Sequence, residues 1–471
     1  MKRTKHNLSN YKLATMEMGK LYPVQLQEVL PGDSMQLSTS ALIRMSPMLA
    51  PVMHPVTVRF HHWFVPNRIL WDKWEDFITG GQDNQNADTP PQIDITDADW
   101  TSGSIADMFG IPKPDDGTTL SVNALPFYAY NMIWNEFYRD QDLQDERTPG
   151  IWGTPASVSW RKDYFTGARP WAQKGNDIVL PIGTSAPLRT LEDPDRTPAL
   201  TRTPASSEDG YVNINGRPAG ETVVADLSQA TGVTATEFRE FFALQRYAEA
   251  RARYGSRYTE YLQYLGIKPS DARLQRPEYL GGGKSTIQFS EIMQTAYDEN
   301  SPVGTLRGHG IGAVKTKHTR RFFEEHGHVI TLMSVVPKSI YQDGVQRLFL
   351  KKDKEDFYQK ELQSIGQQAI KQGEVYAKDP TTVNNIFGYT DRYSEYNSTP
   401  STVSGEFRDT LDFWHMARKF DTPPALNEDF IKCNPTKRIY ASQNTNPLWV
   451  MINNTCVSRR LPRKVSVGRL L

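Results

Sequence analysis

The clearest pattern along the chain is an alternation of apolar and polar residues in "HPVTVRFHHWFVP", residues 54–66. Successive side chains of a β-strand point to opposite faces of a sheet, so this spacing predicts a strand with one buried face. The residues expected on that face are Val56, Val58, Phe60, His62 and Phe64. The opposite face is expected to carry Thr57, Arg59, His61 and Trp63. Pro66 should end the strand, because proline cannot donate a hydrogen bond to a sheet.

Further strands are predicted on both sides of this one. "YPVQLQEVLPGDS" has the composition of a strand closed by a Pro-Gly turn. "EEHGHVITLMSVVP" is apolar on both faces from Val329 to Val336, which is typical of a strand buried between two layers. We also expect strands in "GVQRLFL", "TKRIYAS" and "NPLWVMINN". Strands are therefore concentrated at 20–66 and 326–455, and 67–325 is predicted to be mostly inserted loops and helices of a single domain.

Helical spacing appears in three places within the inserted region. A short helix is expected in "ILWDKWEDFITGG", and an aromatic one in "SVNALPFYAYNMIWNEFYRDQD". A longer one is expected over 234–266, where Thr234 and Glu237 have the spacing of a capping box. Residues 82–122 lack periodicity, and 145–222 are rich in Pro, Gly, Thr and Asp, so we predict surface loops there.

Composition places the chain among folded proteins, while the strand patterns above favour a mainly β structure. It has 471 residues, 38% of them hydrophobic, and a formal net charge of zero. Overall charge therefore says nothing about partners, but its distribution does. Both ends are basic, "KTKHTRR" forms a third basic cluster, and acids concentrate elsewhere.

Two basic ends on a neutral chain favour contact with a polyanion. We predict basic arms at 1–16 and 457–471 that bind nucleic-acid phosphates without reading bases. The residues predicted to make these contacts are Lys2, Arg3, Lys5, Arg459, Arg460, Arg463, Lys464 and Arg469. Trp449 and Tyr440 lie upstream and have the chemistry to stack on unpaired bases. The alternative is that both ends are solvated termini without a ligand.

The stretch "LGGGKST", residues 280–286, resembles a loop that wraps nucleotide phosphates. Such a loop needs a glycine five residues before the Gly-Lys pair, and that position holds Glu278. The following "STIQFSE" favours an extended strand over the required helix. A nucleotide-binding enzyme that uses Gly281–Thr286 therefore stays as the alternative function, and a tightly turned glycine segment is preferred.

Other chemistry is weakly supported. His61 and His62 fall on opposite faces of one strand, while His326 and His328 share a face without the further ligands that zinc needs. We expect hydrogen-bonded strand histidines, no metal and no cofactor. Cys433 and Cys456 are expected to be buried thiols of a protein made in a reducing cytoplasm. We expect no signal peptide, and we expect no segment that crosses a bilayer.

Several blocks together resemble the major capsid protein of the Microviridae, in particular its gokushovirus-like members. These blocks are "FHHWFVPNRILWDKWEDFITGG", "LQRYAEARARYGSRYTEYLQYLGIKPSDARLQRPEYLGGGKSTIQFSE", "RFFEEHGHVITLMSVVP" and "NPLWVMINNTCVSRRLP". They follow the family's order from near residue 20 to the C-terminus. Residues 82–122, 145–222 and 380–405 match least, as variable surface loops would.

The resemblance implies an eight-stranded antiparallel viral jelly roll with large helical and loop insertions. It implies a homo-oligomeric icosahedral shell (T = 1) of about sixty copies that encloses a single-stranded DNA genome. It also implies a structural protein without enzymatic activity, made in the host cytoplasm and then part of the virion. Further implied partners are other virion proteins and a host receptor that the sequence does not identify.

Overall fold

The computed structural model describes residues 3–81, 86–175, 235–254, 257–267, 271, 274–293, 295, 304–363 and 365–462, with the backbone of four short strands between 188 and 225. The chain forms two compact units, one of 1–172 with 255–471 and one of 173–254. Thr234, predicted to be part of a capping box, and most of the predicted surface loop at 145–222 beyond residue 175 lie outside the described residues.

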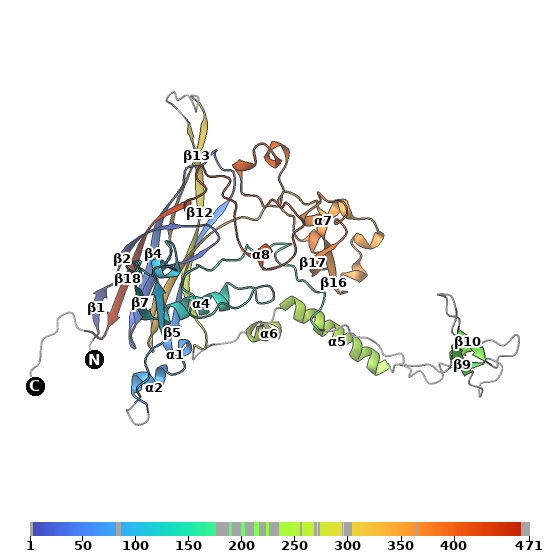
Figure 1. Cartoon of the computed structure of the whole chain (residues 1–471), viewed down its shortest axis with the longest axis horizontal. Coiled ribbons are helices and arrows are strands. Elements are labelled where there is room, and N and C mark those ends of the chain that lie inside the picture. The colour runs from blue at the N-terminus through green and yellow to red at the C-terminus, as the bar shows by residue number, and fades with distance from the viewer. Residues whose placement is uncertain are drawn as a thin grey trace, which may run out of the picture. The chain divides into compact units, whose positions relative to one another are not determined.

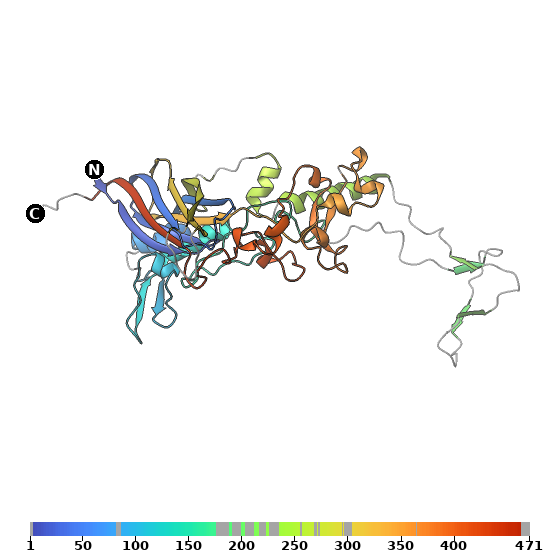
Figure 2. The ribbon, with the colours of Figure 1, turned by 90° about the horizontal axis from the view of Figure 1, so that it is seen from above.

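The larger unit is built on one antiparallel sheet that curls around an apolar interior (Figures 1 and 2). Its main path runs β1–β18–β4–β13–β12–β5–β15–β3, with β2 beside β18 and β14 beside β4. The strands are β1 (Thr4–Asn7), β2 (Asn10–Met16), β3 (Leu21–Val29), β4 (Ser34–Met45), β5 (Val56–Pro66), β12 (Glu278–Met293), β13 (Leu306–Lys315), β14 (Thr319–Phe322), β15 (Gly327–Pro337) and β18 (Leu448–Arg460). This is the mainly β, jelly-roll-like fold that the sequence predicts.

Strand β12 divides this sheet into two layers. Its second half pairs with β13, and its first half pairs with β5. We call β1, β2, β18, β4, β14 and β13 the first layer, and β5, β15, β3 and the first half of β12 the second layer. The largest core cluster lies between them, with Ile43 and Ile452 from the first layer and Phe60 and Met333 from the second. Each strand therefore presents alternate side chains to this interior.

The outer face of the second layer is covered by the segment after β5. Trp63 and Leu332 pack there against Phe127 and Ile133 of α4. The elements on this side are α1 (Asn67–Leu70), α2 (Trp74–Thr79), β6 (Gln92–Thr96), α3 (Ile105–Met108), β7 (Thr119–Asn123) and α4 (Leu125–Phe137). Strand β15 is thus covered on both faces, which explains why every one of its residues is buried.

The remaining elements of the larger unit gather away from the sheet (Figure 1). They are α6 (Tyr258–Tyr264), η1 (Arg347–Leu350), η2 (Lys354–Asp356), η3 (Lys360–Leu362), β16 (Gln367–Lys371), α7 (Gln372–Val375), β17 (Ile386–Asp391), η4 (Ser394–Tyr396), η5 (Gly405–Arg408), η6 (Asp412–Trp414) and α8 (Glu428–Ile431). Phe165, Tyr341, Phe387 and Phe430 form a core of their own among them. The smaller unit contains β8 (Leu188–Thr190), β9 (Ala199–Arg202), β10 (Val212–Asn215), β11 (Val223–Ala225) and helix α5 (Ala235–Tyr254).

A chain of buried hydrogen bonds crosses the interior of the larger unit. From β3, Gln25 accepts a bond of 3.0 Å from Thr331 in β15, whose hydroxyl lies 2.8 Å from His62 Nδ1 in β5. His62 Nε2 lies 3.2 Å from the Thr316 hydroxyl, which also accepts a bond of 2.8 Å from the Thr39 amide in β4.

The chain then returns to the strand where it began. The Thr39 hydroxyl donates to Asn454 in β18 at 3.1 Å, and the Asn454 amide donates to the Val24 carbonyl of β3 at 3.1 Å. Both layers are therefore tied together by polar groups that satisfy one another away from water. A neutral His62 with its proton on Nδ1 fits every donor and acceptor in this chain.

Several expectations for local structure were wrong. Residues 82–122 contain β6, β7 and α3, because Ile93, Ile95 and Ile105 are buried and give the segment a core of its own. "GVQRLFL" forms the 3-10 helix η1, and its Leu348 and Phe349 side chains are exposed. "TKRIYAS" buries Ile439 and Tyr440 but forms only an isolated bridge from Tyr440 to Met48.

The boundaries of the strand-rich regions also differ. Residues 4–7 and 10–16 are strands of the sheet instead of an arm, since Ala14 and Met16 pack on the core. At the other end β18 continues to Arg460. The interval 278–322, which was assigned to insertions, supplies β12, β13 and β14. The aromatic helix at 121–142 and the short helix before Gly80 are confirmed as α4 and α2.

Candidate functional site

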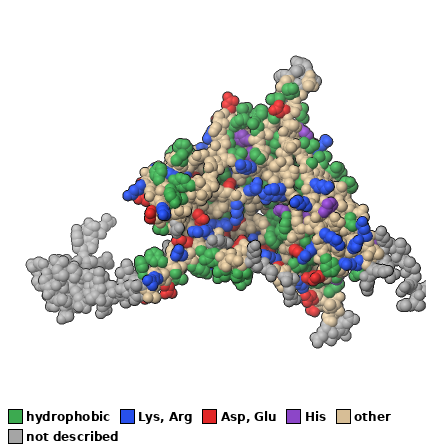
Figure 3. Space-filling view, turned by 180° about the vertical axis from the view of Figure 1, so that it is seen from behind, with side chains coloured by type: hydrophobic (Ala, Val, Ile, Leu, Met, Phe, Trp, Pro, Cys, Tyr) green, Lys and Arg blue, Asp and Glu red, His purple; other side chains and the backbone are tan. Residues whose placement is uncertain are grey.

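The first layer has an unusual charge composition. None of its six strands contains Asp or Glu, although the whole chain has as many acidic as basic side chains. Their outward-pointing cations include Lys5, Arg44, Lys315, Arg320 and Arg459, all exposed. In Figure 3, Lys and Arg side chains are frequent over the side of the molecule that carries the sheet, at the right of the view, and acidic ones are few. We call the outward face of the first layer the open face.

Large apolar side chains accompany these cations on the open face. Tyr11 and Leu13 in β2 are 73% and 79% exposed, and Trp449 and Met451 in β18 are 47% and 46% exposed. The strand register places Trp449 between Thr15 and Arg44, and Met451 between Leu13 and Leu42. Monomeric proteins rarely leave such a contiguous apolar face in water, so the open face is suited to binding.

The cations on this face lie close to one another. Lys5 and Arg459 stand directly opposite in the β1–β18 pair. Like charges in that position repel, and an anion bound between them would remove the repulsion. Arg3 lies beside them, with its guanidinium carbon 5.3 Å from the centre of the Phe322 ring at the end of β14. The N-terminus thus runs alongside the end of β18 (Figure 1).

A groove of about 630 Å³ opens on the same face. It is lined by Arg44, Trp449 and Met451, together with Lys12 and Asp107. Burial lowers the pKa of Lys12 to about 8, while the charge of Asp107 opposes that shift. Lys12 is held in place by a bond from its ammonium to the Met108 carbonyl. The groove offers an aromatic surface and a guanidinium side by side, a combination that stacks and pairs with unpaired nucleotides.

The structure separates the predicted contact residues into groups. It brings Arg3, Lys5 and Arg459 together on the open face. Arg460 differs, because its Nη2 donates to Asp33 at 2.6 Å and to the Glu28 carbonyl at 2.9 Å. Asp33 is completely buried, so Arg460 neutralises an internal charge. Lys2, Arg463, Lys464 and Arg469 lie outside the described residues.

Sequence reasoning missed part of this surface. Arg44, Tyr11 and Leu13 received no role, and the basic cluster at 315–321 was not connected to the two basic ends. One sequence signal could have revealed this surface. The segments that form the six strands of the first layer contain no Asp or Glu, although their hydropathy is ordinary. Connecting them needs the register of β4 with β18 and β13.

The glycine-rich stretch is not a phosphate-binding loop. Gly281–Thr286 lies inside β12, and its backbone pairs with residues 57–62 of β5. Backbone amides that are engaged in a sheet are not arranged to cradle phosphates. The alternative of a nucleotide-binding enzyme that uses Gly281–Thr286 therefore has no support in the structure.

The glycines do permit a close approach of strands, as the sequence suggested. Gly281 has φ +138° beside a β-bulge, and an added Cβ would lie 2.6 Å from the Thr319 hydroxyl. An added Cβ on Gly282 would lie 2.1 Å from the Phe60 carbonyl oxygen.

Histidines and cysteines have structural surroundings. His61 Nδ1 lies 2.5 Å from the Tyr138 hydroxyl, so both His61 and His62 are the hydrogen-bonded strand histidines that were expected. Cys433 and Cys456 are buried, and burial raises the pKa of the Cys456 thiol to about 11. Within the described ranges no cluster of side chains suits a metal ion, and no described helix is long and apolar enough to span a membrane.

Comparison with known proteins gives matches to one family over nearly the whole chain. The family model described as "Capsid protein (F protein)" matches residues 1–467. Capsid protein VP1 of Bdellovibrio phage phiMH2K is 34% identical, over 92% of this chain and 88% of the relative. Capsid protein VP1 of Chlamydia phage 1 is 31% identical over 92% and 90%, and that of Spiroplasma virus 4 is 29% identical over 98% and 94%.

These matches span nearly the whole chain and agree with the jelly-roll-like sheet. They also confirm the gokushovirus-like resemblance and the structural, non-enzymatic role. The role implies assembly of many copies into a shell that is part of the virion. The chain belongs to the phage capsid protein family described as "Capsid protein (F protein)".

Proposed function

We propose that this capsid protein closes into a T = 1 icosahedral shell of about sixty copies, and that its open face contacts the single-stranded DNA genome without reading sequence. The single observation that carries the genome contact is the acid-free first layer, with Lys5, Arg44, Lys315 and Arg459 exposed on it. The chain as a whole is neutral, so an acid-free layer that carries exposed cations means that positive charge is segregated on one surface. Such segregation suits a partner of uniform negative charge.

The aromatic side chains support single-stranded DNA over duplex DNA. Unpaired bases stack on exposed aromatic rings, and Tyr11 and Trp449 are exposed on the open face. Base-paired DNA would present mainly phosphates and offer these rings no stacking partner. The predicted residues Lys2, Arg463, Lys464 and Arg469 belong to the same proposal as extensions of this face. Arg460 does not, since Asp33 already neutralises it.

The domain organisation follows from the same role. We propose that 1–471 is one capsid domain in which 173–254 is an insertion, and that the protein is made in the host cytoplasm before it meets the genome and other virion proteins. Surface side chains that do not pack against the sheet can contact neighbouring copies of the chain in the shell.

The test replaces Lys5, Arg44, Lys315 and Arg459 by glutamine in one chain. A matched control replaces Lys113, Lys352, Lys354 and Lys360, four exposed lysines away from the first layer. We expect the first set to lower the DNA content of assembled particles, and the control to leave it unchanged. In full-length unassembled protein, the salt dependence of oligodeoxythymidylate binding should weaken by about 0.7 in log–log slope for each lost phosphate contact. Equal DNA content and equal slopes in the two sets would refute the genome contact.

A further inference from the structure

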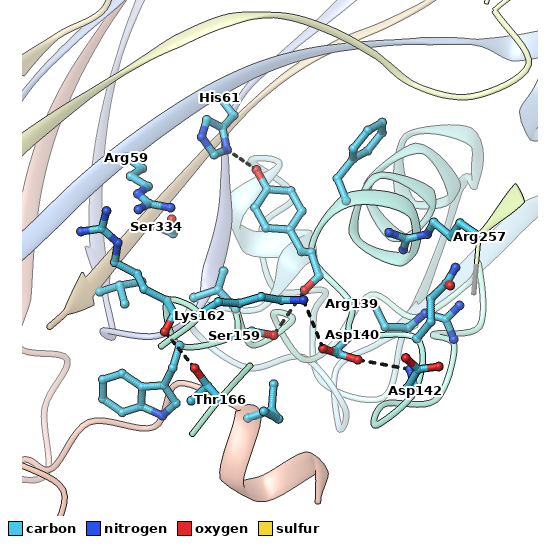
Figure 4. A pocket seen from close by; sticks show the side chains of 18 of the residues that line it. Arg59, His61, Arg139, Asp140, Asp142, Ser159, Lys162, Thr166, Arg257 and Ser334 are labelled. Carbon is cyan, nitrogen blue, oxygen red and sulfur yellow. Dashed lines mark hydrogen bonds and ion pairs between the residues drawn. The ribbon is translucent and has the colours of Figure 1, made fainter. Parts of the chain in front are cut away.

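A second basic site lies on the outer face of the second layer, away from the open face. It is a hollow of about 360 Å³ between strands β5 and β15 and the segment 137–169 (Figure 4). Arg59 of β5 and Ser334 of β15 stand directly opposite each other in the sheet and lie at one end of the hollow. Asp140 and Asp142 lie at the other end.

The acidic end of the hollow is neutralised by its own neighbours. Arg169 approaches Asp140 at 3.1 Å and Asp142 at 3.6 Å. Lys162 reaches Asp140 at 3.8 Å. Neither carboxylate is therefore available to balance the charge of Arg59.

Positive charge accumulates without a partner at the Arg59 end. Arg161 also lines the hollow, and it acts on Arg59 as a nearby like charge. On the other side, Lys284 of β12 stands directly opposite Arg59 in the strand pair. Among the described residues, none of these three side chains makes an ion pair. Burial first, and Arg161 second, lower the pKa of Arg59.

Such an arrangement is unfavourable by itself. Like charges that face each other across a strand pair are destabilising, and a half-buried guanidinium loses part of its hydration. Arg59 is half-buried and Ser334 is buried, with its hydroxyl beside the guanidinium. Guanidinium groups bind phosphate oxygens through paired hydrogen bonds, and a phosphate carries enough charge to satisfy more than one cation.

We propose that the hollow lined by Arg59 and Arg161, with Lys284 opposite Arg59 in the neighbouring strand, is a phosphate-binding site that takes either inorganic phosphate or a phosphate group of a nucleotide strand. Its volume lies at the lower end of the range for small-molecule sites, large enough for a phosphate with an attached sugar. Lys284, which in the sequence resembled the lysine of a nucleotide-binding loop, lies opposite Arg59 because β12 pairs with β5. Its ammonium group therefore adds positive charge beside Arg59. Binding of inorganic phosphate is independent of the proposed genome contact, whereas a genome source for the phosphate rests on it.

The test uses the full-length chain and follows thermal unfolding while phosphate replaces chloride at constant ionic strength. Phosphate should raise the Tm of the unmodified protein, and Arg59→Gln and Arg161→Gln should each weaken phosphate binding about tenfold or more. Lys352→Gln, at an exposed position outside both the hollow and the first layer, should respond like the unmodified protein. No phosphate-dependent rise in Tm, or an equal rise in the Arg59→Gln and Arg161→Gln variants, would overturn the proposal.

Two further measurements separate binding from folding and identify the source of the phosphate. Without phosphate, Arg59→Gln should be at least as stable as the unmodified protein, because it relieves repulsion; a marked loss of stability would assign Arg59 a structural role and overturn the proposal. Competition between phosphate and oligodeoxythymidylate that is lost in Arg161→Gln supports a nucleotide strand as the ligand. Phosphate binding without such competition supports the free anion. Either result is independent of particle DNA content, which tests the open face.

Discussion

His62 in β5 and Thr316 at the end of β13 meet inside the sheet, with the imidazole Nε2 3.2 Å from the hydroxyl oxygen. This contact joins the second layer to the first at the centre of a buried chain of hydrogen bonds. Burial lowers the pKa of His62 to about 4, and the neighbouring His61 adds to the effect. The imidazole is therefore neutral in the folded protein at neutral pH.

The stability of the fold should fall as the solution becomes acidic. His54, His61, His62 and His328 all have a pKa lowered to about 4, chiefly by burial. Unfolded histidine titrates near 6.5, so between about pH 6.5 and pH 4 the unfolded chain binds more protons than the folded one. Stability is then fully present above that window and is lost through it, by up to about 3 kcal/mol for one histidine.

Denaturant unfolding of the unassembled chain at pH 7.5 and pH 5 measures this effect. His62→Gln should reduce the difference between the two pH values, and His318→Gln, at an exposed position, should leave it unchanged. A stability that does not depend on pH across this window would contradict the buried neutral histidines.

Replacement of the two adjacent arginines at the end of β18 should change the free energy of unfolding by different amounts. Arg460→Ala leaves Asp33 buried without its cation and should cost about 3–5 kcal/mol of unfolding free energy. Arg459→Ala removes an exposed side chain and should change stability by less than about 0.5 kcal/mol. Asp33→Asn combined with Arg460→Gln should be less harmful than the sum of the single changes. Equal effects of Arg459→Ala and Arg460→Ala would disprove this assignment.

Methyl groups added to the glycines of β12 should destabilise the sheet. Gly281→Ala forces an alanine into φ +138° and against Thr319, and Gly282→Ala places Cβ against the Phe60 carbonyl. Each should cost about 1–3 kcal/mol or more. Gly153 has open space around its Cβ position and an ordinary backbone, so Gly153→Ala is the matched control. Thermal unfolding of the three variants compares them, and a stable Gly282→Ala protein would argue against the strand register.

The sheet and strands β5 and β15 could be predicted from the sequence, because alternation in β5 reflects burial of one face and apolar residues on both faces of β15 reflect burial of both. The sequence pattern did not predict strands β1 and β2, because their basic side chains are also typical of a free arm. Burial of Ala14 and Met16 becomes evident only when β2 lies beside β18.

The candidate sites were less predictable for the same physical reason. The open face joins Lys5, Arg44 and Arg459, which are far apart in the sequence and meet through strand pairing. Likewise, the proximity of Lys284 to Arg59 follows from register and not from any local motif. Charge clustering at the termini identified the polarity of the surface but not its extent.

The open face is expected to line the inside of the assembled shell, and an electron cryo-microscopy reconstruction of genome-filled particles would reveal its orientation. The outward side chains of β2, β18 and β4, including Tyr11, Trp449 and Arg44, should face the interior and touch density for nucleic acid. A reconstruction in which these side chains lie on the outer surface of the particle, or are covered by a neighbouring copy, would contradict the account.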